Sequence, residues 1–133
     1  MRYLLDVNVL LALGLTEHEF HHRVVGWLKR RRGESLPEVA TCPITELAFV
    51  RILSQPVYHY SVREARTLLA QLKAIPDLKF SFLADDHSSD HLPNWVTKPG
   101  QVTDGHLAEL ARAHGAVLAT LDAKIAHSFL IPT

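Results

Sequence analysis

Short apolar runs alternate with amphipathic helical patterns along the chain, and this alternation predicts its secondary structure. The apolar runs predict strands at 3–5, 39–42, 78–83 and 116–121, with a fifth strand at 129–131. Helical patterns are found between them at 7–13, 18–32, 43–53, 62–75 and 103–114, and a short helix is predicted at 122–127. Strands that alternate with helices are joined by right-handed crossovers. The pattern therefore predicts an α/β fold, a three-layer α/β/α sandwich with a central parallel sheet of four to five strands.

Glycines mark several of the predicted helix ends. Gly14, Gly33 and Gly115 each stand where a helical pattern stops, and glycine readily ends a helix because it tolerates the left-handed conformation. No shift in composition, internal repeat or linker-like stretch divides the chain. We therefore expect residues 1–133 to form one domain, with one long loop between residues 85 and 100.

Composition indicates a compact globular protein. The 133 residues are 47% hydrophobic and 21% charged, which excludes a disordered or collagen-like chain. Fourteen basic and fourteen acidic residues give no net charge, so overall charge indicates neither a nucleic-acid partner nor a membrane surface. The uncharged apolar run 7–16 is too short for a membrane span, which requires about 18 residues. We therefore expect a cytoplasmic protein without a membrane partner, and the single cysteine, Cys42, agrees with a reducing compartment.

Four of the fourteen acidic residues lie in apolar or helix-opening sequence: Asp6, Glu46, Asp104 and Asp122. Asp6 follows the first predicted strand and Asp122 follows the fourth, so a parallel sheet would bring both to its carboxyl edge. Glu46 lies in the first turns of the helix after the second strand, and Asp104 opens the helix that leads to the fourth. We therefore expect the four acids to meet in one cleft.

The chemistry of these acids has an ordinary and a functional interpretation. Aspartate at a helix start caps free N–H groups and stabilises the helix by about 0.5–2 kcal/mol. Glu46 is different, because it lies inside a helix beside Ile44 and Leu47, where an unpaired carboxylate would be unfavourable. Clustered carboxylates repel one another unless they take up protons or bind a cation. Since oxygen ligands favour Mg²⁺ or Mn²⁺ over zinc, the acids predict a site for one of these ions.

Four segments of the sequence resemble the PIN-domain ribonucleases, specifically the VapC-type toxins. They are Leu4-Leu5-Asp6-Val7-Asn8-Val9-Leu10-Leu11, Thr45-Glu46-Leu47, Val102-Thr103-Asp104-Gly105-His106-Leu107 and Leu118-Ala119-Thr120-Leu121-Asp122. They follow the family's order and cover nearly the whole chain. The resemblance implies a PIN-like fold and Mg²⁺- or Mn²⁺-dependent hydrolysis of RNA. It also implies a homodimer and a small antitoxin protein that is encoded beside the toxin.

The resemblance assigns roles to individual residues. Its catalytic acids fall on Asp6, Glu46, Asp104 and Asp122. Of these, Asp6 and Asp104 would bind one metal directly, while Asp122 and Glu46 would surround that metal or form a second metal site through water. Asn8 and Thr120 match the companion polar positions and would orient the carboxylates by hydrogen bonding. Gly105 stands where relatives often carry alanine, a difference that we expect to leave the metal site intact.

Two basic features are candidates for contact with substrate or partner. The run Lys29-Arg30-Arg31-Arg32 is the densest, but cations at a helix end complement the helix dipole and stay solvated, which is the interpretation we favour. Arg51 lies just over one turn after Glu46 on the same predicted helix. It is the better candidate for contact with RNA phosphate or with the antitoxin, and a surface ion pair is its ordinary alternative.

Two other functions are consistent with parts of the sequence. His18-Glu19-Phe20-His21-His22 matches the H-E-x-x-H pattern of zinc proteases, in which two histidines one helical turn apart bind zinc. No third ligand follows at the expected spacing, so this is the remote alternative. The nearer alternative is a catalytically silent PIN-like module that serves in binding or as a scaffold. The presence of all four acids favours the enzyme, and RNA cleavage that requires Mg²⁺ or Mn²⁺ would separate the two.

Overall fold

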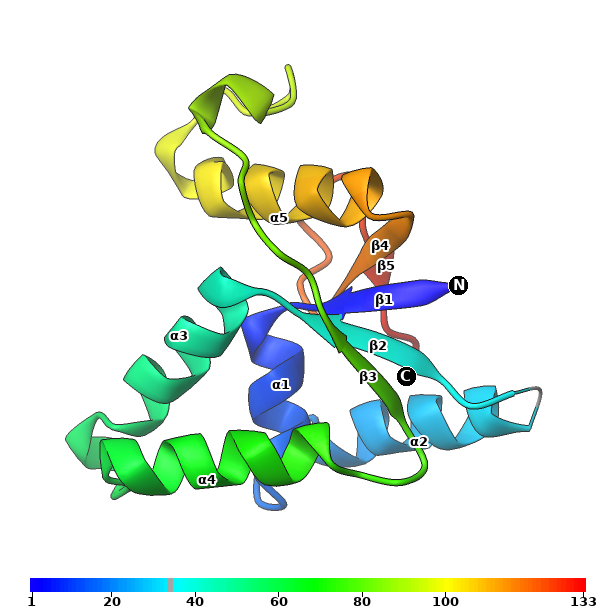
Figure 1. The fold of residues 1–133 in the computed structure, drawn as a ribbon, viewed down its shortest axis with the longest axis vertical. Coiled ribbons are helices and arrows are strands. Elements are labelled where there is room, and N and C mark those ends of the chain that lie inside the picture. Colours follow the sequence, from blue (N-terminus) through cyan, green and yellow to red (C-terminus); the bar gives the residue numbers. More distant parts are fainter. Residues whose placement is uncertain (34) are drawn as a thin grey trace.

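The computed structural model describes residues 1–33 and 35–133 and has a parallel sheet at its centre (Figure 1). The strands are β1 (Arg2–Leu5), β2 (Glu38–Thr41), β3 (Lys79–Phe82), β4 (Ala116–Thr120) and β5 (Phe129–Leu130). They lie in the order β3-β2-β1-β4-β5, and all neighbours in this sheet are parallel. The first strand of the chain is therefore the central strand of the sheet, and its neighbour β4 comes near the end of the sequence.

Helices cover both faces of the sheet (Figure 1). On one face lie α1 (Val7–Gly14), α2 (His21–Arg32), α3 (Pro43–Leu53) and α4 (Val62–Lys73), and on the other lies α5 (Val102–Ala113). Short 3-10 helices are found at Pro56–Tyr58, Ser89–His91 and Pro99–Gln101. This arrangement confirms the predicted α/β/α sandwich with a parallel sheet.

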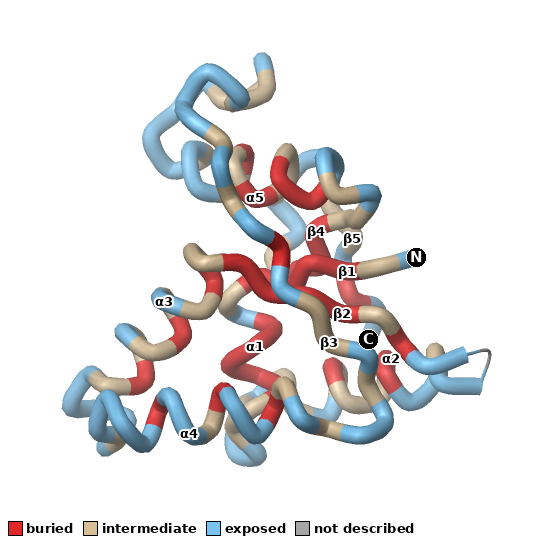
Figure 2. Tube along the Cα trace, in the orientation of Figure 1, coloured by how far each residue is buried: buried red, intermediate tan, exposed pale blue. Residues whose placement is uncertain are grey.

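Successive residues of a strand pack into the two layers in turn. Tyr3 and Leu5 belong to the core beneath α1 to α4, whereas Leu4 packs with Leu107 and Leu110 of α5. Figure 2 shows that the buried residues are concentrated in the sheet and on the helix sides that face it. Because both faces are covered, the inner residues of β1, β2 and β4 are mostly apolar and buried, as expected for a parallel sheet.

Local sequence explains several helix boundaries. Pro43 opens α3, where its fixed φ suits the first turn. At the start of α4, the Ser61 hydroxyl accepts a hydrogen bond from the N–H of Glu64, and the Glu64 carboxylate accepts one from the N–H of Ser61. Gly115 follows α5 with a φ of +69°, the left-handed conformation that glycine adopts without strain. These helix boundaries agree with the sequence prediction.

The helix predicted over 18–32 begins later, at His21. Before it, Nδ1 of His18 accepts a hydrogen bond from the N–H of Phe20 at 3.0 Å, which favours a turn over a helix at this point. His18 therefore lies outside the helix that carries His22. The two histidines of the H-E-x-x-H pattern do not share a helical face, so the zinc-protease interpretation lacks the geometry that it requires.

The short helix predicted over 122–127 is wrong, because this segment forms turns. Oδ1 of Asp122 accepts a hydrogen bond from the N–H of Lys124 at 2.9 Å. An aspartate that binds the backbone two residues later competes with helix formation and stabilises a turn. His127 has a φ of +55°, which lies outside the helical region. The turns lead directly into β5.

Across the described part of the chain, each helix falls short of the length and hydrophobicity that a bilayer crossing requires. The most apolar of them, α1, has eight residues, and five of these are buried in the protein core.

Candidate functional site

The carboxyl edge of the sheet brings together residues from the two ends of the chain. In the parallel pair β1 and β4, Leu5 lies opposite Ala119, and the N–H of Asp6 donates to the carbonyl of Ala119 at 3.0 Å. Asp6 directly follows β1, while Thr120 ends β4 and Asp122 comes two residues later. Parallel α/β sheets bind their ligands beyond this edge. The fold therefore places these polar residues where a ligand site is expected.

Asp6 is a buried acid with a fixed orientation. Its Oδ1 accepts a hydrogen bond from the N–H of Val7 at 2.8 Å, and its Oδ2 accepts one from the buried Thr120 hydroxyl at 2.9 Å. The N–H of Asp122 donates to the same hydroxyl at 3.0 Å, so hydrogen bonds link the ends of β1 and β4. Burial raises the pKa of Asp6 despite its two hydrogen bonds, and the charge of Asp122 adds to the rise.

Asp104 approaches the same place from the other side of the sheet. It lies in the first turn of α5 and is half-buried. Burial raises the pKa of Asp104, and the charges of Asp6 and Asp122 raise it further. The ion pairs found within residues 1–33 and 35–133 involve none of these three acids. Repulsion among the three carboxylates is therefore not balanced by a side-chain cation in the described part of the protein.

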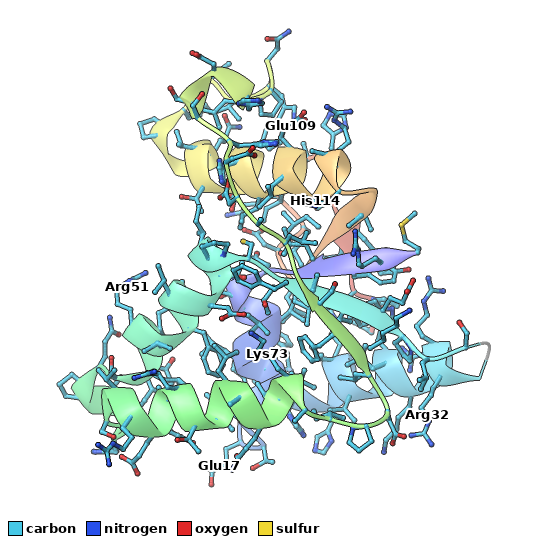
Figure 3. The ribbon with its side chains drawn as sticks, viewed as in Figure 1. Glu17, Arg32, Arg51, Lys73, Glu109 and His114 are labelled. Atoms are coloured by element: carbon cyan, nitrogen blue, oxygen red, sulfur yellow. The ribbon has the colours of Figure 1, made fainter. Side chains whose placement is uncertain are left out.

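Glu46, the fourth predicted acid, is balanced by a cation. It lies near the start of α3, and its Oε2 accepts a hydrogen bond from the Thr41 hydroxyl. The same oxygen pairs with Nζ of Lys73, which projects from α4 toward α3, at 2.7 Å (Figure 3). The ammonium group also lies 5.5 Å from the centre of the Phe82 ring. Glu46 is thus held by two donors at the end of β2.

The apolar neighbours of Glu46 in the sequence indicate that it needs a partner, but they do not identify Lys73. The residue follows Leu72 and stands four positions after Leu69, and both leucines are buried. Residues four apart share a helix face, so Lys73 lies at the margin of the apolar face of α4. A lysine at the margin of a buried helix face is a signal for an internal ion pair, although its partner can be identified only from the fold.

The structure brings three of the four predicted acids together electrostatically. Asp6, Asp104 and Asp122 lie near one another, whereas Glu46 is paired with Lys73 on the β2 side of the edge. Asn8 is exposed in the first turn of α1. Among the described residues, the hydrogen bonds found at Asp6 come from Val7 and Thr120 and not from Asn8.

The chemistry of these donors fits a hard divalent cation. Carboxylate oxygens are the ligands that Mg²⁺ and Mn²⁺ prefer, and burial together with neighbouring carboxylates raises the pKa values of Asp6 and Asp104. Throughout residues 1–33 and 35–133, no three His, Cys, Asp or Glu side chains are already gathered to hold an ion. Binding would therefore draw the carboxylates closer, which is the expected response of like charges to a cation placed between them.

Gly105, next to Asp104, has a packing role that sequence analysis did not indicate. A Cβ atom at this position would lie 2.2 Å from Cγ2 of Val96 and 3.4 Å from Cδ of Pro93. The segment before α5 therefore packs directly against the backbone of the helix. This contact fixes the turn of α5 that carries Asp104.

The basic candidates lie outside this group of acids. Within the run 29–32, Arg31 donates to the Tyr3 hydroxyl and covers its ring, with 5.3 Å between the guanidinium carbon and the ring centre. Arg32 pairs with Asp77 at 2.8 Å, so these two members of the run make structural contacts. Arg51 is exposed on the outer side of α3 (Figure 3). The ion pairs of the described residues do not include it.

Comparisons with known proteins support the family resemblance. The PIN domain family model matches residues 3–128. Ribonuclease VapC38 of Mycobacterium tuberculosis is 39% identical, over 92% of this chain and 86% of that protein. Ribonuclease VapC29 of the same species is 36% identical, over 100% of this chain and 98% of that protein. Ribonuclease VapC39 is 38% identical, over 96% and 94% respectively.

A solved structure supports the fold independently. It is the crystal structure of VapBC2 from Rickettsia felis bound to a DNA fragment from the promoter. The matched chain has a TM-score of 0.65 and 15% sequence identity, over 98% of this chain and 97% of that one. Together with the match of the family model over residues 3–128, these relatives confirm the predicted resemblance, and the chain belongs to the PIN domain family.

Proposed function

We propose that this protein is a divalent-metal-dependent endoribonuclease and the toxin of a toxin–antitoxin pair. The observation that carries the proposal is the group formed by Asp6, Asp104 and Asp122, whose repulsion no side-chain cation of the described residues balances. Such a group, at the ligand-binding edge of a PIN-domain sheet, suits a bound cation and a phosphodiester substrate. The relatives named ribonuclease support RNA as the substrate class.

Each residue of the group has a distinct task in this function. When bound, Mg²⁺ or Mn²⁺ would act as a Lewis acid toward the phosphate and favour ionisation of a water molecule. Asp6 and Asp104 would hold the ion, and Asp122 would complete the coordination directly or through water. Thr120 keeps the Asp6 carboxylate in one orientation through its hydrogen bond of 2.9 Å. A cation at this position would also lower the raised pKa values of Asp6 and Asp104, so that both stay ionised.

Three further residues have proposed supporting roles. Glu46, held by Thr41 and Lys73, would interact with the reaction centre through water. Asn8 is exposed beside the capping residue Asp6, where its amide could contact either a carboxylate or the RNA. Arg51 would contact phosphate or the antitoxin from the exposed side of α3.

The biological setting is inferred from the comparisons. The Rickettsia felis structure is described as VapBC2, and the curated relatives are named VapC ribonucleases. We infer a small cognate antitoxin protein for this chain as well. A homodimer and a cytoplasmic location, where RNA is accessible, complete the proposal.

Cleavage of RNA by the purified protein tests this function. We expect cleavage of total cellular RNA with Mg²⁺ or Mn²⁺, and none when EDTA removes the ion. Asp6→Asn should lower the cleavage rate by at least about a hundredfold. The fold should persist because asparagine is also a good helix cap, which circular dichroism can check.

A matched control separates the site from the general effect of losing an acid. Asp77→Asn removes the exposed ion pair with Arg32 and should leave cleavage unchanged. Cleavage that persists in EDTA or in the Asp6→Asn protein would contradict the proposal. RNA binding without cleavage under every ion condition would instead identify a silent binding module.

A further inference from the structure

The two sides of the carboxyl edge differ in the way their negative charge is balanced. On the β1 and β4 side, the ion pairs of the described residues leave out Asp6, Asp104 and Asp122. On the β2 side, Glu46 is paired with Lys73 at 2.7 Å. Because β2 lies directly beside β1 in the sheet, the balanced and unbalanced sides adjoin.

Lys73 is held in place by several contacts. It lies in the last turn of α4, where a positive charge complements the helix dipole. Its ammonium group pairs with Glu46 and lies over the ring of Phe82. The Lys73 side chain is 34% exposed and that of Glu46 is 20% exposed. These contacts hold the ammonium group beside the Glu46 carboxylate.

The pair between Lys79 and Glu38 has the opposite character. Its nitrogen and oxygen are 3.3 Å apart, and its side chains are 69% and 42% exposed. Such exposed pairs contribute little to stability. The contrast shows that the contact between Lys73 and Glu46 is a built part of the edge.

From this arrangement we propose that the ammonium group of Lys73 takes the charge-balancing place of a second divalent cation, so that each chain binds one such ion. The inference rests on the proposed metal-dependent function. Oε2 of Glu46 already accepts hydrogen bonds from Thr41 and Lys73, so this oxygen is engaged. A divalent ion on Glu46 would lie close to the ammonium group, and Coulomb repulsion opposes that arrangement. Lys73 is therefore a positioning residue that confines the exchangeable ion to Asp6, Asp104 and Asp122.

The number of bound Mn²⁺ ions per chain tests this proposal without reference to activity. Titration of the metal-free protein, followed by electron paramagnetic resonance of free Mn²⁺, gives this number directly. We expect one ion per chain in the unmodified protein. Lys73→Met keeps most of the aliphatic stem and removes the charge, so it should bind two ions, with affinity for the second increased by at least about tenfold.

Three further variants distinguish charge from packing. Lys73→Arg retains the positive charge and should bind one ion. Lys79→Met removes a lysine from the exposed pair with Glu38 and should also bind one. Adding Glu46→Gln to Lys73→Met should abolish binding of the second ion, because it removes the carboxylate that would hold it. Thermal unfolding in EDTA verifies that each variant is folded, and Lys73→Gln replaces the methionine variant if that protein does not fold.

The possible outcomes separate the two proposals. Two ions of similar affinity in the unmodified protein, or a single ion in the uncharged Lys73 variant, would overturn the role of Lys73 and leave the nuclease function standing. Absence of Mn²⁺ binding in the unmodified protein would contradict the proposed function itself.

Discussion

Two aspartates, one within α5 and one in contact with it, have opposite electrostatic surroundings. Asp104 is in the first turn of the helix, where burial and neighbouring carboxylates raise its pKa. Asp85 follows β3 and contacts Nε2 of His106, on α5, at 2.6 Å. Although burial favours a higher pKa for Asp85, the hydrogen bonds from His106 and from the N–H of His87 hold it below its ordinary value.

The difference distinguishes acids that have a basic partner in the fold from acids that have none among the described residues. Where an acid supports the structure, the fold supplies its partner, as Lys73 does for Glu46 and Arg112 does for Glu109. In the described part of the chain, the ion pairs do not reach Asp104. An acid without a side-chain cation at this edge of the sheet is consistent with the proposed binding of a cation from solution.

The comparison predicts its largest effect on RNA cleavage. Asp104→Asn should lower the cleavage rate by about a hundredfold to a thousandfold, because it removes a proposed metal ligand. Asp85→Asn should leave the cleavage rate within about threefold of that of the unmodified protein, because the Asp85 carboxylate is hydrogen-bonded to His106 and is not a proposed metal ligand. Single-turnover cleavage of a defined RNA measures both rates. Equal losses in the two variants would show that the two aspartates do not differ in function.

A second prediction concerns the packing that fixes the turn of α5 that carries Asp104. Gly105→Ala should destabilise the protein by about 1–3 kcal/mol, because its Cβ would overlap Val96. Val96→Ala in the same chain should restore part of the loss. Gly100→Ala is the matched control, since a Cβ there meets nothing within 4 Å. Urea unfolding of the unmodified protein, the two single glycine variants and the double variant measures these differences. Equal stability of Gly105→Ala and Gly100→Ala would disprove the close contact.

A third prediction uses pH to distinguish the two electrostatic environments. The raised pKa values of Asp6 and Asp104 mean that these two carboxyl groups bind more protons in the folded protein than in the unfolded chain above pH 3.8. Their contribution to stability in EDTA should therefore fall as the pH rises from 3.8 through these raised pKa values. Asp104→Asn should raise Tm at pH 7 by about 2–4 °C, and Mg²⁺ should reduce this difference.

Asp85 should behave in the opposite way. Its lowered pKa contributes stability that is present above pH 3.8 and is lost as the pH falls through the pKa of the folded state. Asp85→Asn should therefore lower Tm at pH 7. Thermal unfolding across the pH range measures both variants, and shifts of the same sign would contradict the assignment of the two environments.

The smallest expected effect is at Arg51. Arg51→Ala should raise the KM for RNA by about twofold to threefold and weaken its salt dependence, because one phosphate contact is lost. Its stability should stay within about 0.5 kcal/mol of the unmodified protein. Arg63→Ala, another exposed arginine, provides the control. An unchanged KM together with unchanged inhibition by the antitoxin would leave Arg51 as an ordinary surface residue.

Hydrophobic periodicity was sufficient to predict the layers and the parallel sheet, because each element buries its apolar residues in a regular pattern. Periodicity failed where side chains bind the nearby backbone. The hydrogen bond from the N–H of Phe20 to the His18 ring favours a turn, so α2 begins later than predicted. The Asp122 carboxylate likewise stabilises a turn where a helix was predicted. The prediction of one domain over residues 1–133 stays a prediction.

The candidate site was predictable in part for a similar reason. Acids at strand ends must meet in a parallel sheet, so the association of Asp6 with Asp122 follows from topology. The partners Lys73 of Glu46 and Val96 of Gly105 depend on how helices and loops pack across the fold. Contacts of this kind have no local sequence pattern, which explains why both were missed.

The central position of β1 has a consequence for synthesis of the protein. Asp6 is translated well before its two partners, because the hydroxyl that orients it belongs to Thr120 and its charged neighbour is Asp122. Until β4 has been translated, β1 lacks one of its two neighbouring strands. A growing chain therefore cannot assemble the complete group of acids until Asp122 has been translated.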